Sequence, residues 1–189
     1  YWDEQADTIH YVCIETKFGR IMIDLFSDIA PMHVESFKMH ANTGYFNGTI
    51  FHRVIPGFVI QGGDPNSRSS NRRTHGLGGS SSVFFGIGDK RDPSTWKLPS
   101  EFNSIPHKRG IVSMARGSDE NSAGSQFFIC VADSPHLDGK YTAFGEVIEN
   151  FHVIDHIVNT PTNYMQVKRM SRKVIPKGED PNDWITFRD

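Results

Sequence analysis

The chain has 189 residues, a length typical of one domain, and its formal net charge of −2 gives no general attraction for nucleic acids or acidic membrane surfaces. Hydrophobic residues make up 37% of the chain, and 14 residues are phenylalanine, which is enough for a substantial core. No run of about 18 apolar residues occurs, so the sequence predicts no membrane-spanning helix.

The two cysteines, Cys13 and Cys130, both lie within apolar runs. This favours two buried thiols, with a disulfide bond between them as the less favoured alternative. The chain begins at Tyr1 rather than at Met and shows no secretory leader. We therefore expect a cytoplasmic location, or export to the periplasm or the outside of the cell if a leader preceded Tyr1.

The first part of the chain predicts a polar arm followed by a β-hairpin. Residues 1–8 are polar and acidic, and we expect an N-terminal arm there. Apolar and β-branched residues at 9–15 and 21–26 flank a turn at 17–20, which is typical of two antiparallel strands.

A helix is predicted to begin near Pro31, because proline is favoured in the first turn of a helix. Either Ser27 or Asp28 is expected to cap its first N–H groups. Its buried face should be formed by three residues at helical spacing: Val34, Phe37 and Ala41.

Residues 51–64 contain two short apolar runs on either side of a Pro-Gly pair, a pattern that predicts a strand, a tight turn and a second strand. Strand alternation places Arg53 on the same face as Phe51 and Ile55. A cation in an apolar strand is costly unless it has a task. Arg53 is therefore a candidate functional residue, and Gln61 in the second strand is another.

Serine, arginine and glycine dominate residues 65–99, which predicts a long irregular loop inserted into the domain. Loops of this length within a compact domain are usually functional or mobile. The basic run at 67–73 could contact an acidic partner, but a solvated loop is the favoured interpretation.

Patterns for cofactors and metals are absent or weak. Gly76 and Gly78 lack the third glycine of a dinucleotide-binding loop, and no P-loop occurs. His152 and His156 are four residues apart, but no carboxylate base lies between them, so exposed side chains are favoured over a metal site. We expect neither a cofactor nor a metal.

The rest of the chain adds further strands and a second helix, for which Asn150 is the expected cap. Residues 176–189 predict a polar C-terminal tail. The expected strands lie at 110–114, 126–131, 141–148 and 166–175. Many short strands that do not alternate with helices indicate a mainly β antiparallel barrel or sandwich with helices at its ends.

Three motifs occur in the order that is typical of one family: residues 51–64, 124–129, and 137–140 with 144–145. They resemble the signatures of the cyclophilins, the peptidyl-prolyl cis–trans isomerases. The resemblance implies an eight-stranded antiparallel β-barrel capped by two α-helices, and family members of this size are usually monomers. The cyclophilin-like domain would then occupy residues 9–175, with the 65–99 loop as an insertion.

The resemblance also implies site residues. Arg53 matches the catalytic arginine, with Gln61 and Phe58 beside it. Eight further residues would form the proline pocket and the peptide groove: Val59, Ala115, Arg116, Gln126, Phe128, His136, Leu137 and Tyr141.

Four of these positions depart from the commonest cyclophilin pattern. Val59 stands where Met is usual, Arg116 where Asn is usual, and Tyr141 where His is common. His136 stands where cyclosporin-sensitive members carry Trp. Because an indole donor and a large apolar surface are missing there, we expect weakened cyclosporin binding.

The predicted function is cis–trans isomerisation of X–Pro bonds in peptides and folding proteins, without a covalent intermediate. Arg53 would donate to the proline nitrogen more strongly in the twisted transition state than in the planar amide. The alternative is a binding or chaperone module for proline-containing segments that has weak catalysis. The expected partners are proline-containing peptides or proteins, without nucleic acid or membrane.

Overall fold

The computed structural model describes residues 8–160 and 165–176, and this part of the chain is mainly β. The predicted arm at 1–8 and tail at 176–189 lie outside the described residues, apart from Thr8 and Pro176. The strands are β1 (Thr8–Thr16), β2 (Gly19–Leu25), β3 (Ile50–Phe51), β4 (Arg53–Ile55), β5 (Val59–Gly62), β6 (Ile111–Met114), β7 (Phe127–Cys130), β8 (Ala143–Glu149) and β9 (Met165–Pro176). The helices are α1 (Pro31–Asn42) and α2 (Phe151–Val158).

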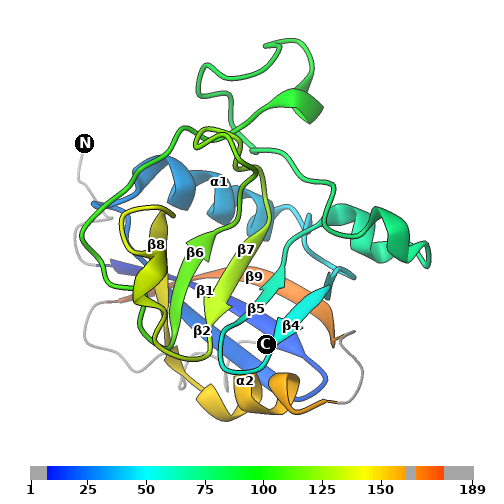
Figure 1. Cartoon of the computed structure of the whole chain (residues 1–189), viewed down its shortest axis with the longest axis vertical. Coiled ribbons are helices and arrows are strands. Elements are labelled where there is room, and N and C mark those ends of the chain that lie inside the picture. The colour runs from blue at the N-terminus through cyan, green and yellow to red at the C-terminus, as the bar shows by residue number, and fades with distance from the viewer. Residues whose placement is uncertain (1–7, 161–164, 177–189) are drawn as a thin grey trace.

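The described strands form one antiparallel sheet in the order β3-β9-β1-β2-β8-β6-β7-β5-β4. The two ends of this order, β3 and β4, are neighbours in sequence and are separated by His52 alone. The sheet therefore curls round until its edges meet, and β3 and β4 together act as one interrupted strand. Counted in this way, the barrel has the eight strands that were predicted, with α1 and α2 at its opposite ends (Figure 1).

Aromatic side chains from separate elements fill the core beneath α1. Phe37 of α1 is 1% exposed, and its ring centroid lies 5.4 Å from that of Phe46, 5.2 Å from that of Phe127 and 5.1 Å from that of Phe144. Tilted and edge-on aromatic pairs of this kind add to the gain from burying apolar area. The predicted helix face is confirmed, since Val34, Phe37 and Ala41 are all buried.

The start of α1 differs from the prediction. Its N-cap position is Ala30, and neither Ser27 nor Asp28 serves as the cap. Instead, the Glu101 carboxylate accepts hydrogen bonds from the backbone N–H groups of Met32 (3.0 Å) and His33 (2.9 Å). A carboxylate satisfies the free N–H groups of a first turn and suits the positive end of the helix dipole. The cap therefore comes from a segment remote in sequence.

The strand–turn–strand prediction for residues 51–64 is confirmed, but the expected faces are not. Phe51 is fully buried in the core and Arg53 is exposed, so the two side chains do not share a face. The reason is the interruption at His52, which breaks the alternation between β3 and β4. The turn itself is tight, with the Phe58 N–H donating to the Ile55 carbonyl at 3.0 Å, and Gly57 provides the positive φ of 73° that the turn needs.

The second helix begins where expected, but Asn150 does not cap it through its side chain. Asn150 adopts a left-handed conformation with a φ of 65° and makes no side-chain cap hydrogen bond. His152 and His156 are exposed, as expected. Among the described residues, no helix is long and apolar enough to cross a membrane.

Cys13 and Cys130 are both buried, and no disulfide bond joins them, which confirms the favoured interpretation. Burial raises the pKa of the Cys130 thiol to about 12, because the thiolate would lose its hydration there. Cys130 therefore behaves as a small apolar side chain in this fold.

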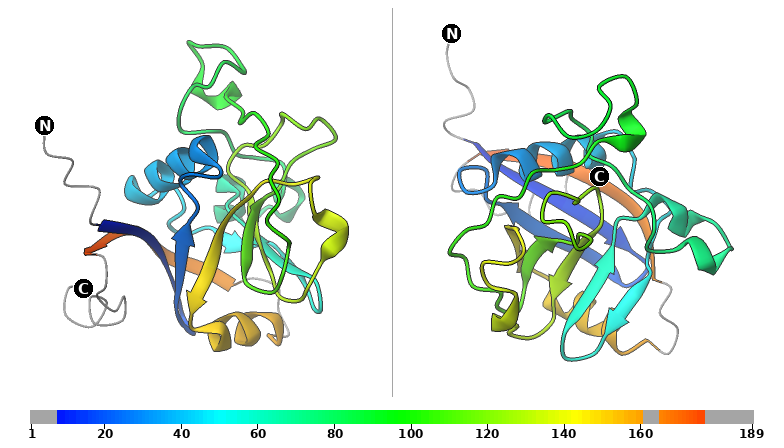
Figure 2. Two further views of the ribbon diagram at one scale, coloured as in Figure 1. Left: turned by 90° about the vertical axis from the view of Figure 1, so that its left-hand side faces the viewer. Right: turned by 45° about the horizontal axis from the view of Figure 1, so that its top comes forward.

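The 65–99 loop is irregular, as predicted, but it is firmly attached to the barrel. It contains three short 3₁₀-helices at Pro65–Arg68, Arg72–Thr74 and Pro93–Thr95, and it makes two excursions beyond the barrel (Figures 1 and 2). At its end, fully buried Leu98 pairs with Ala123. These contacts place parts of the loop beside β5 and β7, where they contribute to the site described below.

His40 of α1 is a buried titratable group behind this loop. Its Nε2 donates to the Ser80 carbonyl at 2.7 Å, and its ring stacks on Tyr45 at a centroid distance of 3.7 Å. Burial lowers the pKa of His40 from 6.5 to about 4, outweighing the opposite effect of the Ser80 carbonyl.

The lowered pKa of His40 predicts a stability that falls on acidification. The unfolded chain takes up the proton first, so the stabilisation is complete above about pH 6.5 and is lost towards about pH 4. At about 1.4 kcal/mol per pKa unit, the loss approaches about 3 kcal/mol.

Urea unfolding at about pH 7.5 and about pH 4.5 measures this effect. The variant His40→Gln keeps a donor for Ser80 and should show a smaller fall in unfolding free energy than the wild type. The control His152→Gln changes an exposed histidine and should follow the wild type. Equal pH dependence for His40→Gln and the wild type would show that His40 contributes nothing.

Candidate active site

A groove of about 340 Å³ lies on the outer face of the barrel, within the size range of small-ligand sites. It is lined by strands β4, β5 and β7, the segment after β6, and residues 136–141. Ten of the eleven predicted site residues line it together: Arg53, Phe58, Val59, Gln61, Ala115, Arg116, Phe128, His136, Leu137 and Tyr141.

The floor of the groove is apolar because of strand alternation. Val59 and Phe128 lie on β5 and β7, which are paired, and they are packed with Leu137 in a small buried cluster separate from the main core. Phe58 and Tyr141 pack at the border of this cluster. The outer face of the sheet thus forms a compact apolar surface that can hold a non-aromatic ring.

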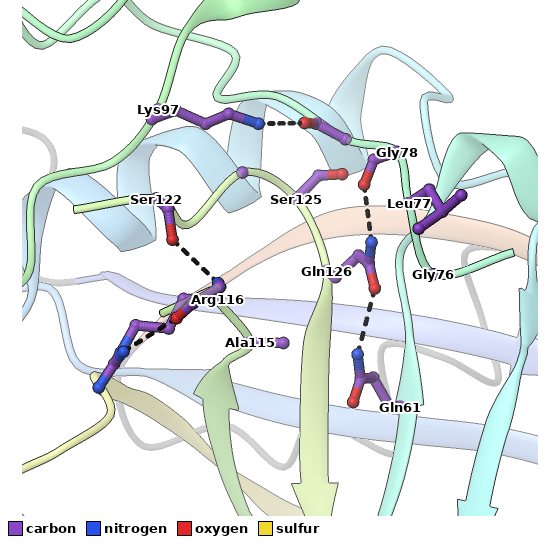
Figure 3. Close-up of a pocket in the computed structure, with 13 residues that line it drawn as sticks. Gln61, Gly76, Leu77, Gly78, Lys97, Ala115, Arg116, Ser122, Ser125 and Gln126 are labelled. Atoms are coloured by element: carbon purple, nitrogen blue, oxygen red, sulfur yellow. Dashed lines mark hydrogen bonds between the residues drawn. The ribbon is translucent and has the colours of Figure 1, made fainter. Parts of the chain in front are cut away.

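A row of side-chain amides connects Arg53 to the 65–99 loop. Arg53 and Gln61 are register partners on β4 and β5, and Arg53 Nη1 donates to Gln61 Oε1 at 3.3 Å. Gln61 Nε2 donates to Gln126 Oε1 at 3.1 Å, and Gln126 Nε2 donates to the Gly78 carbonyl at 2.7 Å (Figure 3). Each amide orients the next, so the Gln61 oxygen is directed towards Arg53.

A second pocket of about 230 Å³ adjoins the groove and shares Gln61, Ala115 and Arg116 with it. Gln126, the one predicted residue outside the groove, lines this pocket. Residues 76–79 of the 65–99 loop also line it, with Gly78 next to Gln126 (Figure 3). The loop therefore supplies one side of a continuous, two-part cleft.

His136 lies at the rim of the groove. It is exposed, and its ring stacks on Phe58 with a centroid distance of 5.4 Å and an interplanar angle of 30°. Arg116 contacts Tyr141 at the other side of the rim, with its guanidinium carbon 4.7 Å from the ring centroid. Aromatic contacts thus surround the entrance.

Three linked residues near the groove, the buried His107 and Ser113 and the exposed Asp138, were missed by the sequence analysis. His107 is buried, and its Nδ1 donates to Asp138 Oδ1 at 3.0 Å while its Nε2 accepts from Ser113 Oγ at 2.9 Å. The His107 ring also stacks behind Phe128 at a centroid distance of 6.2 Å. The one sequence signal was the position of Asp138, which directly follows Leu137 in the third motif.

The charge states of this group follow from its surroundings. Burial lowers the pKa of His107, so the imidazole is neutral near pH 7 despite the nearby carboxylate. The backbone N–H of His107, 2.7 Å from Asp138 Oδ1, lowers the pKa of Asp138. The arrangement has the order of a Ser-His-Asp triad, but Ser113 is fully buried and is the register partner of Phe128. Because the Ser113 hydroxyl has no access to a substrate, it does not act as a nucleophile, and the three residues hold β6 and the segment after Leu137 in place.

The site is therefore an apolar groove on the outer face of a mainly β barrel, with the exposed guanidinium of Arg53 at its edge. The family described as "Cyclophilin type peptidyl-prolyl cis-trans isomerase/CLD" matches residues 11–176. The chain belongs to this family of enzymes.

Similar proteins of known name agree. A probable peptidyl-prolyl cis–trans isomerase of Brucella suis is 39% identical over 80% of this chain and 73% of its own length. A peptidyl-prolyl cis–trans isomerase of Arabidopsis thaliana is 42% identical over 80% of this chain and 84% of its own length. The crystal structure of a cyclophilin-type isomerase of Cryptosporidium parvum has 29% identity and a TM-score of 0.74, covering 92% of this chain and 99% of that one.

Replacing His107 tests the linked group near the groove. His107→Phe keeps an aromatic ring behind Phe128 but leaves the buried Ser113 hydroxyl without its acceptor. We expect the unfolding free energy to fall by about 1–3 kcal/mol, measured by urea unfolding. The double variant His107→Phe/Ser113→Ala removes the orphaned hydroxyl and should recover part of the loss. No recovery would mean that the hydrogen bond to Ser113 is not the source of the stability.

Proposed function

We propose that the protein accelerates rotation about X–Pro bonds by using Arg53 as a hydrogen-bond donor to the proline nitrogen in the twisted transition state. The observation that carries the proposal is the position of this guanidinium, which is exposed at the edge of the apolar groove and oriented by Gln61 at 3.3 Å. A guanidinium is a planar, forked group that only donates hydrogen bonds.

The chemistry requires no bond to be broken. Resonance gives the peptide C–N bond a rotational barrier of about 18–20 kcal/mol, and twisting the bond removes that resonance. The proline nitrogen then regains its lone pair and becomes a better acceptor. A donor fixed beside it stabilises the twisted state more than the planar one, and this difference is what accelerates the reaction.

The remaining groove residues have separate tasks in this proposal. Phe128 and Leu137 hold the pyrrolidine ring against the apolar floor, with Val59 beneath. Gln61 has its amide fixed by Gln126, so it holds Arg53 and can also contact the substrate carbonyl that rotates. The neighbouring pocket, which is lined by Gln126 and the 76–79 segment, can accept a further residue of an extended peptide.

A structure of a similar protein supports the proposal that the groove binds proline-containing ligands. The Cryptosporidium parvum isomerase has also been crystallised in the presence of the dipeptide Ala-Pro, and that structure has 30% identity and a TM-score of 0.72 over 89% of this chain. Peptides with an Ala-Pro bond are therefore suitable test substrates for this protein.

The second candidate function is a module that captures proline-containing segments with weak catalysis. It is favoured by the rim, where Arg116 and His136 depart from the commonest pattern and make contacts within the protein. This module would bind an Ala-Pro peptide without accelerating exchange between its isomers. The retained arginine at the groove edge favours the enzyme.

Arg53→Ala tests the mechanism. Loss of one donor that acts mainly in the transition state should lower kcat/KM for an Ala-Pro peptide about 10²- to 10³-fold, with little change in peptide affinity. The matched control is Arg73→Ala, which removes an exposed arginine that lines neither part of the cleft and should leave kcat/KM unchanged.

NMR exchange spectroscopy of the peptide isomers separates the two candidate functions. Enhanced exchange with the wild type that is lost with Arg53→Ala supports the enzyme. Binding without enhanced exchange in the wild type supports the capture module, and full activity of Arg53→Ala would refute the role given to Arg53.

The rim predicts low affinity for cyclosporin. His136 offers a smaller apolar surface than tryptophan, and its ring is already stacked on Phe58. The variant His136→Trp should bind cyclosporin about tenfold more tightly than the wild type, which corresponds to about 1.4 kcal/mol. Inhibition constants in the Ala-Pro assay provide the comparison, and equal constants for the two proteins would contradict the prediction.

A further inference from the structure

Arg116 lies where the groove and the second pocket meet, and it lines both. Its guanidinium is nevertheless directed away from the cleft. Nε and Nη2 donate to the Lys140 carbonyl at 3.2 and 2.6 Å, and Nη1 donates to the Gly117 carbonyl at 3.0 Å. In Figure 3 the side chain extends away from Gln61 and Gln126. Three of its five N–H donors are thus engaged with the protein's own backbone.

The guanidinium also lies against two aromatic rings. Its carbon is 4.7 Å from the ring centroid of Tyr141 and 5.8 Å from that of Phe102. Tyr141 in turn meets Phe128 edge-on, with centroids 5.8 Å apart and an interplanar angle of 81°. A continuous series of contacts therefore runs from Arg116 through Tyr141 to the floor of the groove.

No carboxylate takes part in these contacts. Among the described residues, the ion pairs involve other side chains, and the acidic residue Asp119 on the same loop accepts a hydrogen bond from the backbone of Asn121. Arg116 is held by carbonyl dipoles and ring faces. Such contacts depend on the planar, forked shape of a guanidinium, which a lysine ammonium does not reproduce.

We propose that Arg116 is a positioning residue that holds Tyr141 against Phe128 and so fixes one wall of the groove, rather than a group that binds the substrate by its charge. Arg116 and Tyr141, which both depart from the commonest cyclophilin pattern, then act as a coupled pair. The kinetic consequence rests on the proposed function of the groove as the site of X–Pro isomerisation.

The expected kinetic signature is a change in KM rather than in kcat. The wall formed by Tyr141 and Phe128 contacts the bound proline in both the planar and the twisted state, whereas Arg53 acts on the twisted state. Loosening the wall removes binding that is common to both states, which raises KM and leaves kcat nearly constant.

Five variants test the proposal in an Ala-Pro isomerase assay. Arg116→Lys and Arg116→Asn should each raise KM about three- to tenfold with kcat within about twofold of the wild type. Tyr141→Leu should do the same, and Tyr141→Phe should raise KM less than Tyr141→Leu because it keeps the ring face. The double variant Arg116→Asn/Tyr141→Leu should be no worse than the poorer single variant, since each change already breaks the pair.

A matched control removes a similar contact elsewhere. Arg109 lies over the Phe151 ring at 5.3 Å and lines neither part of the cleft. Arg109→Lys should leave KM unchanged. Two results would overturn the proposal: a KM for Arg116→Lys equal to that of the wild type, which indicates recognition by charge, or additive effects in the double variant, which indicate independent residues.

A second measurement tests, without any catalytic turnover, whether Arg116 holds Tyr141 in place. In the free protein, the Arg116 Nε–H should be protected from hydrogen exchange, and the Tyr141 ring resonances should shift in Arg116→Lys but not in Arg109→Lys. An unprotected Nε–H or unchanged Tyr141 resonances would overturn the proposed role of Arg116. If the wild type passes this test but has no isomerase activity, the result counts against the proposed function alone. The variants are then compared by the dissociation constant of the Ala-Pro peptide instead of by KM.

Discussion

The arrangement of this barrel depends on a one-residue interruption of the sheet at His52. On one side of it, β3 pairs with β9, and on the other side, β4 pairs with β5. The interruption allows Phe51 to enter the core and Arg53, two residues later, to leave it. Gly62 completes the fit, because a Cβ there would lie 3.1 Å from the Phe51 ring. Closure of the barrel and exposure of the guanidinium thus have the same structural origin.

Two hydrogen-bonded series on either side of the groove connect its rigid floor to its loops. The amides of Gln61 and Gln126 lead from Arg53 to the Gly78 backbone. On the other side, His107 joins Ser113 of β6 to the segment that carries Leu137. The strands set the distance between the walls, and the connecting segments supply Arg116, His136 and Tyr141 at the rim.

The sequence predicts the parts of this structure that depend on local pattern or on motif order. Periodicity locates the hairpin, the α1 face and most strands, and three motifs bring ten residues into one groove. Several of the failures share a cause, which is dependence on contacts between distant segments. The cap of α1 comes from Glu101, and the hydrogen bonds of His107 join it to Ser113 and Asp138, which are separate from it in sequence. The position of Arg116 was predicted, but the direction of its guanidinium depends on Lys140 and Tyr141.

The cap supplied by Glu101 also affects the order in which the chain acquires its structure. The first turn of a helix is the costly part to form, because several residues are fixed for one hydrogen bond. In α1 the acceptor for that turn lies 68 or 69 residues further along the chain. The helix therefore gains its full stability only after the segment before β6 has docked, which closes a long loop and slows assembly. One carboxylate thereby makes the formation of an apparently local element cooperative with the docking of a segment remote in sequence.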